Sequence, residues 1–193
     1  MGGRAMEWRQ VAAARRLLAR EDGAVVRDWG GAVPVVLAWP NTYRVGMSSL
    51  AMHGLYRWFN DLPGVVCERA FASYERRITL DEPPITLESQ RPLREAAILA
   101  FSLSFELDYF HLIAMLHAAD VPVLASERGE GDPLVLLGGP AVSANPEPLA
   151  AVADAVVIGE AEELLGDLVD AARGGWGGAR DAVLRDWARV PGV

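Results

Sequence analysis

The stretch from residue 134 to residue 163 constrains the fold most, because it shows one pattern twice. Two short apolar runs, residues 134–137 and 155–158, each end at glycine, where a parallel strand would pass into a helix. A strand, a glycine turn and a helix in succession are typical of α/β proteins. In such sheets ligands bind outside the carboxyl ends of the strands, so we expect both glycine turns at the rim of one site.

The segments that follow these two runs carry helix signals. Asn145 and Pro146 have the form of an N-cap followed by proline at the first helical position. Glu160, Glu162 and Glu163 would lie in the first turn of the next helix, where negative charge offsets the positive end of the helix dipole. We therefore predict one helix after each glycine turn.

The rest of the chain fits the same alternation of strands and helices. Near-continuous apolar runs predict further strands at residues 32–39, 65–71 and 96–102, and a candidate short strand at residues 122–125. Apolar spacing predicts helices at residues 4–20, 47–59, 107–119, 162–172 and 179–189. The helix at 47–59 has one apolar stripe that we expect to face the sheet, whereas the helix at 107–119 is apolar on most faces and is expected to be deeply packed. Together these elements predict a doubly wound, mostly parallel sheet flanked by helices.

Length and composition fit one globular domain. The 193 residues are 51% hydrophobic and 23% charged, which leaves no long disordered tract. The formal net charge of −8 disfavours a polyanion as the default partner, and every basic residue is arginine. No apolar run approaches the ~20 residues of a membrane span, and the N-terminus lacks the apolar block of a signal peptide. We therefore expect no membrane partner and a cytoplasmic location.

We divide the chain into three parts. Residues 1–30 are predicted to form a helical extension, residues 31–173 the α/β domain, and residues 174–193 a glycine-rich linker and a last helix. Residues 73–92 are polar and contain prolines, so they are the least regular part of the domain. A lid or an inter-domain contact could lie there.

Few residues are placed for catalysis or metal binding. Cys67 is the only cysteine, which excludes an internal disulfide and any iron–sulfur site built from this chain alone, and we interpret it as a small buried hydrophobe. The three histidines are not spaced i, i+3 or i, i+4, so no helix presents a histidine pair to a metal. His111 falls on an apolar helix face and is expected to be a core histidine. The sequence contains no G-x-x-x-x-G-K-[ST] and no G-x-S-x-G motif, and no G-x-G-x-x-G follows the first strand.

Three carboxylates are predicted near one edge of the sheet. Glu106 and Asp108 follow the strand at 96–102, on the side where Glu160 also lies. Two carboxylates that meet across a cleft could act as general acid and base. Carboxylates at helix starts also serve as caps, which is the more frequent role.

Seven segments, taken in order, resemble one family. They are residues 40–56, 67–71, 87–93, 101–109, 121–128, 133–150 and 154–163, and they include the sequences PNTYRVGMSSLAMHGLY, CERAF, FSLSFELDY and DAVVIGEAEE. This order resembles the N-terminal cobalamin-binding-like domain of radical SAM proteins, in the subgroup where this domain precedes the radical SAM barrel. The resemblance covers roughly residues 30–170.

The resemblance implies a single Rossmann-like, cobalamin-binding-like domain with an extra N-terminal helix. It also implies a downstream barrel in the same polypeptide, whose C-x-x-x-C-x-x-C motif binds an iron–sulfur cluster that cleaves S-adenosylmethionine. The 193 residues contain no such motif, so we expect the radical chemistry, the cluster and S-adenosylmethionine to belong to the barrel, with no catalytic residue in this stretch. The implied substrate is a small molecule or an RNA.

Cobalamin is the cofactor that the resemblance implies for this domain. Cobalamin domains of the methyltransferase type place D-x-H-x-x-G after the first strand, and its histidine binds cobalt. Residues 41–46 read NTYRVG, so cobalamin would bind here without a histidine as lower ligand. We expect the loops at four strand ends to form the rim of a cleft and to present backbone amides to the ligand. The predicted cofactor-binding residues are Asn41, Thr42, Tyr43, Gly46, Ser102, Ser104, Glu106, Gly138, Gly139, Pro140, Gly159 and Glu160.

Two other hypotheses compete with a cofactor cleft. The domain could be a degenerate scaffold that binds no ligand and only docks the barrel or a macromolecular substrate. A cleft filled by the domain's own side chains, such as Tyr43 or Met47, would favour that hypothesis. An independent nucleotide-binding module is the third, and it lacks the phosphate-binding fingerprint.

Overall fold

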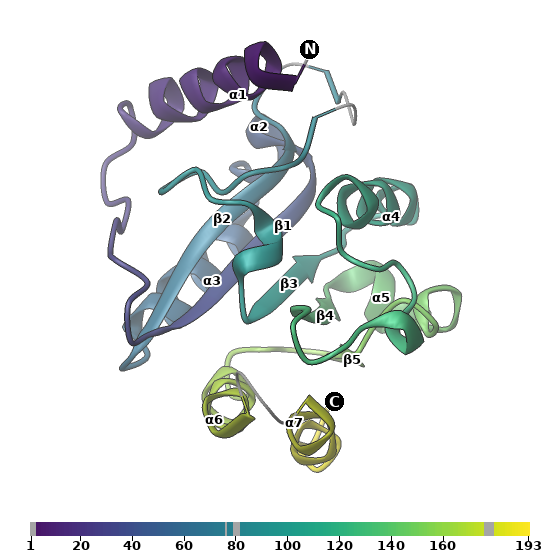
Figure 1. Ribbon diagram of the computed structural model, residues 1–193. Helices are drawn as coiled ribbons and strands as arrows, with labels where there is room; N and C mark the ends of the chain where they lie inside the picture. The colour runs from purple at the N-terminus through teal and green to yellow at the C-terminus, as the bar shows by residue number, and fades with distance from the viewer. Residues whose placement is uncertain (1–2, 76, 79–81, 176–179) are drawn as a thin grey trace.

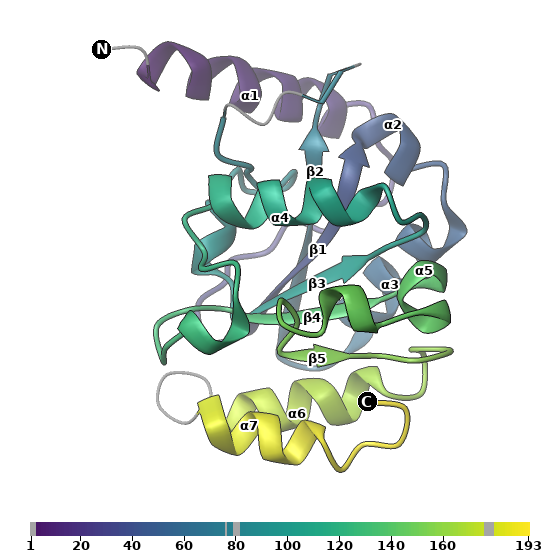
Figure 2. The same cartoon turned by 90° about the vertical axis from the view of Figure 1, so that its right-hand side faces the viewer.

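A five-stranded parallel sheet with helices on both faces forms the body of the chain (Figure 1). The computed structural model describes residues 3–75, 77–78, 82–175 and 180–193. The strands are β1 (Val33–Thr42), β2 (Val65–Ser73), β3 (Ile98–Ser102), β4 (Leu134–Gly138) and β5 (Ala155–Val156). Neighbouring strands pair in parallel in the order β2-β1-β3-β4-β5, which Figure 2 shows from the α1 side to the α7 side. The predicted Rossmann-like α/β fold is therefore confirmed, with a sheet that is wholly parallel in the described residues.

The strand order reverses at β1. The chain first passes outward from β1 to β2, and then returns past β1 to β3 before it continues to β4 and β5. The helix after β1, α3 (Leu50–Asp61), packs on one face of the sheet, and the helix after β3, α4 (Asp108–Ala118), packs on the other. This divergence places a topological switch point between the carboxyl ends of β1 and β3, where ligands bind in open parallel sheets.

Each face of the sheet has its own apolar core, because side chains alternate along the strands. On one face, Val35 and Leu37 of β1 belong to the same cluster as α3 and α6 (Leu165–Gly175). On the other face, Val36 and Ala38 pack with α4 and with the short α5 (Pro140–Ala144). Burial from both sides explains why the strands are almost continuously apolar in the sequence. The remaining helical elements are α1 (Gly3–Leu18), α2 (Tyr43–Gly46), α7 (Arg180–Trp187) and the single 3-10 turns η1 (Leu93–Glu95), η2 (Ala125–Glu127) and η3 (Glu147–Leu149).

The outer edge of β2 is covered by part of the irregular segment 73–92. The Leu87 N–H donates to the Arg69 carbonyl at 2.7 Å, which extends the hydrogen bonding of the sheet edge. The buried Arg69 guanidinium pairs with Glu88 at 2.7 Å and with Glu21 at 2.6 Å. The described part of this segment thus protects a sheet edge, a position that would otherwise expose unpaired backbone groups.

The candidate strand at 122–125 does not form. The carbonyl groups of Pro122 and Val123 accept hydrogen bonds from the Arg128 guanidinium at 2.9 and 2.8 Å. Pro122 itself has no N–H to donate to a neighbouring strand. The prediction was wrong because a buried arginine satisfies the backbone groups that a strand would have offered to the sheet.

The Asn145-Pro146 signal does not start an α-helix. The chain turns at Gly139 and enters α5 directly at Pro140, and Asn145 is the residue at which α5 ends. Pro146 then precedes only the 3-10 turn η3. The predicted helix after the first glycine turn exists, but it is short and begins earlier than the cap signal indicated.

The second helix signal, the three glutamates after Gly159, also lies outside the helix that it was expected to start. Glu160, Glu162 and Glu163 lie in a loop, and α6 begins only at Leu165. Gly159 adopts a positive φ of 92°, which carries the chain away from the helical conformation directly after the strand. The three glutamates are therefore available for a role other than helix capping.

The predicted deep packing of the helix at 107–119 is wrong for one of its faces. Phe105, Leu107 and Phe110 are 64%, 66% and 71% exposed. A helix that lies on a sheet buries only the stripe that faces the sheet, here Leu112 and Met115 among others. In the described part of the chain, no element covers the opposite face of α4.

The terminal elements agree with the predicted helices at residues 4–20 and 179–189. Of the predicted glycine linker, Gly174 and Gly175 end α6, and residues 176–178 lie outside the described residues. None of the described helices is both long enough and apolar enough to span a membrane.

Candidate ligand cavity

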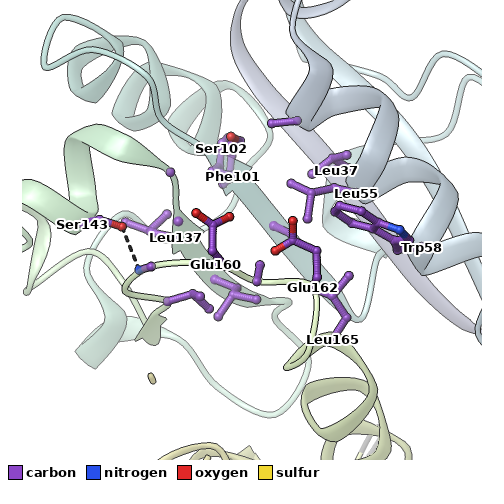
Figure 3. A pocket seen from close by; sticks show the side chains of 18 of the residues that line it. Leu37, Leu55, Trp58, Phe101, Ser102, Leu137, Ser143, Glu160, Glu162 and Leu165 are labelled. Carbon is purple, nitrogen blue, oxygen red and sulfur yellow. Dashed lines mark hydrogen bonds between the residues drawn. The ribbon is translucent and has the colours of Figure 1, made fainter. Parts of the chain in front are cut away.

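A cavity of about 520 Å³ lies at the carboxyl edge of the sheet, on the face that carries α3 and α6 (Figure 3). Sites for small molecules usually measure about 300–1,000 Å³, so the cavity has the size of such a site. Its lining comes from β1, β3, β4 and the region around β5, together with α3 and the start of α6. The apolar side chains on this face include Leu37, Leu55, Phe59, Ala100, Val157 and Leu165.

The position of the cavity follows from the topology. Leu37 of β1 and Phe101 of β3 both line it, and these strands flank the switch point of the sheet. α3 departs from β1 on this face, whereas the connection after β3 passes to the opposite face, so the carboxyl half of β3 is left uncovered here. A crevice at this point is the expected ligand site of a doubly wound sheet.

Half of the residues predicted for cofactor binding line this cavity. They come from the ends of β3 and β4 and from the β5–α6 loop, and they are Ser102, Gly138, Gly139, Pro140, Gly159 and Glu160. The register pairs Ser102 directly with Gly138, so the serine and the glycine turn are brought together by the parallel ladder.

Four polar side chains lie at the rim of the cavity, and two of them are carboxylates. Ser143 accepts a hydrogen bond from the Gly159 N–H at 3.1 Å, which ties α5 to the β5–α6 loop. Glu160 and Glu162 extend from that loop toward the interior of the cavity, and Ser102 lies beyond them at the end of β3, as Figure 3 shows. The polar part of the lining is therefore acidic and hydroxylic.

The close approach of two loops explains why position 139 is glycine. Gly139 has a φ of 102°, and a Cβ atom there would lie 2.6 Å from the Leu103 carbonyl oxygen and 2.8 Å from the Leu103 nitrogen. Both atoms belong to the backbone and cannot move away cheaply. The glycine is required for the packing of the β3 and β4 exits, independently of any ligand.

The backbone amides around the glycine turns are largely engaged within the protein. Leu103 N–H donates to the Gly138 carbonyl at 2.9 Å, and Ala141 N–H donates to the Leu103 carbonyl at 3.2 Å. The Gly159 N–H is bonded to Ser143, as described above, and Pro140 has no N–H. Of the backbone N–H groups that these turns were expected to present to a ligand, only a few therefore remain available.

The exit loop of β1 is separate from the cavity. Asn41 accepts from the Thr42 N–H at 2.9 Å and donates to the Asp108 carboxylate at 3.3 Å. The Thr42 hydroxyl accepts from the Val45 N–H at 3.4 Å and so caps the single turn of α2. Neither Asn41 nor Thr42, the last two residues of β1, lines the cavity.

Tyr43, Gly46 and Met47 also lie outside the cavity lining. The Tyr43 hydroxyl donates to Glu21 at 2.6 Å, and burial, reinforced by this bond, raises the pKa of the phenol. A Cβ atom at Gly46 would lie 2.5 Å from a ring carbon of Phe71, so packing accounts for this glycine. The cavity is not filled by Tyr43 or Met47, the two side chains whose presence there would favour a degenerate scaffold.

Ser104 and Glu106 lie beyond the rim and do not line the cavity. Asp108 is 2% exposed, and its carboxylate accepts from the Phe105 N–H at 3.3 Å as well as from Asn41. It therefore holds the loop before α4 in place, although no side chain caps the N–H groups of α4, and it does not line the cavity that Glu160 borders.

The sequence interpretation missed the part of the site that α3 contributes. Leu50, Ala51, Leu55 and Trp58 line the cavity, and Leu50 is 88% exposed. These residues belong to the apolar stripe that was expected to face the sheet. The signal was present, but an apolar stripe looks the same whether it packs against a sheet or borders an apolar cavity.

No histidine lines the cavity. His111 is half-buried and its Nδ1 lies 3.0 Å from the Pro40 carbonyl, whereas His53 Nε2 lies 2.9 Å from the Met47 carbonyl. In the part of the chain that the structure describes, no group of three or more metal-binding side chains occurs. Cys67 is fully buried in β2, and burial raises the pKa of its thiol.

Comparison with known proteins gives one match. Residues 51–193 match the family described as radical SAM proteins, N-terminal. No curated protein and no solved structure matches the chain. The matched region begins within α3 and includes β2 to β5, and with them most of the cavity. The chain therefore belongs to the family of N-terminal regions of radical SAM proteins.

Proposed function

We propose that this domain contributes a cofactor or substrate cleft to the iron–sulfur barrel of a radical SAM enzyme that acts on a small molecule or an RNA. The observation that carries the proposal is the open cavity of about 520 Å³ at the switch point of the sheet. Its apolar floor and few polar groups are typical of small-molecule sites. The buried Cys67 is the only thiol of the 193 residues, so the cluster and S-adenosylmethionine are assigned to the barrel.

Cobalamin is the cofactor that we propose for the cleft. The cavity is large enough for part of a corrinoid: Leu55 and Phe59 would contact its apolar portion, and Glu160 would accept hydrogen bonds from its amide groups. No histidine lines the cavity, so the cobalt would have no histidine ligand from the lining. The chain's own contribution would be to exclude water from the apolar portion and to fix the orientation of the ring.

The test is a visible spectrum of the purified chain after incubation with hydroxocobalamin and desalting. We expect the parent chain to retain corrinoid absorbance. Ala51→Trp, which places an indole in the cavity, should lose it, whereas Arg57→Trp on the exposed side of α3 should keep it. If the parent chain retains no corrinoid, the cofactor role is wrong.

A scaffold function remains as a second proposal, because the structure exposes an apolar surface at the start of α4. Phe105, Leu107 and Phe110 are each more than half exposed, and no described element covers them. Such residues are enriched where proteins dock. In this alternative the domain docks the barrel or a macromolecular substrate, and Ala51→Trp would leave the activity of the full protein unchanged.

A further inference from the structure

We infer that the cavity selects by charge: the part of a ligand that enters it is apolar, carries N–H donors, and is neutral or cationic, so a phosphate group is kept out of the cavity itself. This inference rests on the proposed ligand-binding role of the cavity and names the class of group that binds there. It follows from three separate features of the lining, namely its carboxylates, its lack of cationic side chains, and an aromatic side chain at its border.

The carboxylates have no other task that the structure shows. Glu160 and Glu162 come from the β5–α6 loop, and Figure 3 shows both side chains directed into the cavity from one side. They lie before Leu165, the first residue of α6. Neither forms an ion pair with an arginine of the described chain, although carboxylates elsewhere in this domain, such as Glu88 and Asp154, do so. Both side chains are exposed, so their charge is open to a cationic or N–H group that enters the cavity.

Cationic side chains are missing from the lining. The described residues that border the cavity include no arginine and no histidine, and the chain contains no lysine. The Gly159 N–H, which would be the nearest amide to an anion held by the loop, already donates to Ser143. A phosphate in this cavity would meet two carboxylates with no compensating cation, whereas an ammonium or amide group would meet acceptors.

Trp58 supplies an aromatic surface on the opposite side. The indole is 39% exposed and lines the cavity from α3, across from the loop that carries Glu162. Gly54 makes this position possible, because a Cβ atom there would lie only 3.1 Å from two carbons of the Trp58 ring. An indole face attracts cations and stacks on flat apolar groups, so it favours the same ligand class as the carboxylates.

The test uses two probes with the same ring and opposite charge, naphthylmethylamine and naphthoate. Their affinities for the parent chain are measured by saturation-transfer NMR at low and at high salt. We expect the amine to bind about tenfold more tightly at low salt, with a smaller preference at high salt. Glu160→Gln combined with Glu162→Gln should reduce the preference to about twofold or less, because the amides keep the shape and lose the charge. Glu163→Gln, an exposed neighbour outside the lining, should leave the preference unchanged.

The outcomes separate this inference from the function on which it rests. Equal affinities, or tighter binding of naphthoate, would overturn the charge selectivity while the cavity remained a ligand site. A preference that survives the double substitution would overturn the role of the two carboxylates. If neither probe binds the parent chain, or if Ala51→Trp fails to block both probes, the cavity is not a ligand site and both proposals fail together.

Discussion

Substitution of Asp154 by asparagine should cost much of the stability of this domain, although Asp154 is remote from the cavity. Its carboxylate lies in a buried cluster with Arg128 at 2.8 Å and Arg180 at 2.5 Å, and it also accepts the Val135 N–H at 2.7 Å. The three side chains are 2%, 0% and 8% exposed. The cluster joins η2, the start of β4 and the first residue of α7 at the amino edge of the sheet.

The magnitude follows from the charge that would be left behind. Asparagine has nearly the same shape as aspartate but no charge, so two buried guanidinium groups would face each other with no anion between them. Burial already lowers the pKa of Arg128, and Asp154 is the group that opposes this effect. Removing one partner from a buried ion pair costs about 3–5 kcal/mol. For a domain of this size, that loss corresponds to a melting temperature about 6–20 °C lower.

Urea denaturation followed by far-UV circular dichroism at neutral pH measures this loss. The matched control is Asp170→Asn, which removes the same charge from an exposed pair with Arg173, where the atoms are 3.6 Å apart, and should cost less than about 0.5 kcal/mol. Arg180→Met in the Asp154→Asn background should recover part of the loss, because it removes one of the two unpaired cations. A loss below about 1 kcal/mol for Asp154→Asn would refute the assignment of this cluster as a structural anchor.

Three further predictions concern the sheet edges and the helix surface. Gly139→Ala should lower the free energy of unfolding by at least about 2 kcal/mol, because its Cβ would meet the Leu103 backbone at a positive φ, and urea denaturation measures this change. Burial raises the pKa of Glu88 to about 6 from 4.5, against the opposing charge of Arg69, so the folded state keeps a proton that the unfolded state has released in this window. The free energy of unfolding should therefore fall by up to about 2 kcal/mol as the pH rises from 4.5 to 6, and Glu88→Gln should flatten this slope in denaturation curves recorded at each pH. Phe110→Ser should change stability by less than about 0.5 kcal/mol, since this ring is 71% exposed, and a large loss in the same assay would show that the ring is covered.

Five of the strands and their parallel arrangement in one sheet were predictable, because local patterns indicate them. Residues 134–137 are apolar and are followed directly by glycines, a pattern typical of a buried parallel strand that ends in a tight turn. The structure forms β4 and its turn there. The location of the site at the carboxyl edge was predictable for the same reason. It depends on the parallel arrangement alone and not on the identity of any side chain.

The sequence could not predict which of the expected rim residues line the cavity and which lie away from it. This depends on contacts between distant parts of the chain. Asn41 is held by Asp108, and Tyr43 by Glu21, and no pattern near residue 41 indicates either partner. Similarly, the candidate strand at 122–125 loses its carbonyl groups to Arg128. Sequence periodicity predicts where a strand or helix could form. Whether it forms can depend on a buried charged side chain several residues away, which periodicity does not reveal.

The distribution of paired and unpaired charges supports the location of the site more directly than any single motif. The buried carboxylates of this domain are used structurally: Glu88 neutralises Arg69 beside β2, and Asp154 neutralises two arginines at the amino edge. Burying a charge is costly unless it is paired, so these clusters are explained once their partners are named. Glu160 and Glu162 differ because both are exposed side chains that border the cavity, where water can solvate their charge without a structural partner. Their place beside the cavity, and not any cost of burial, makes them candidates for contact with a ligand.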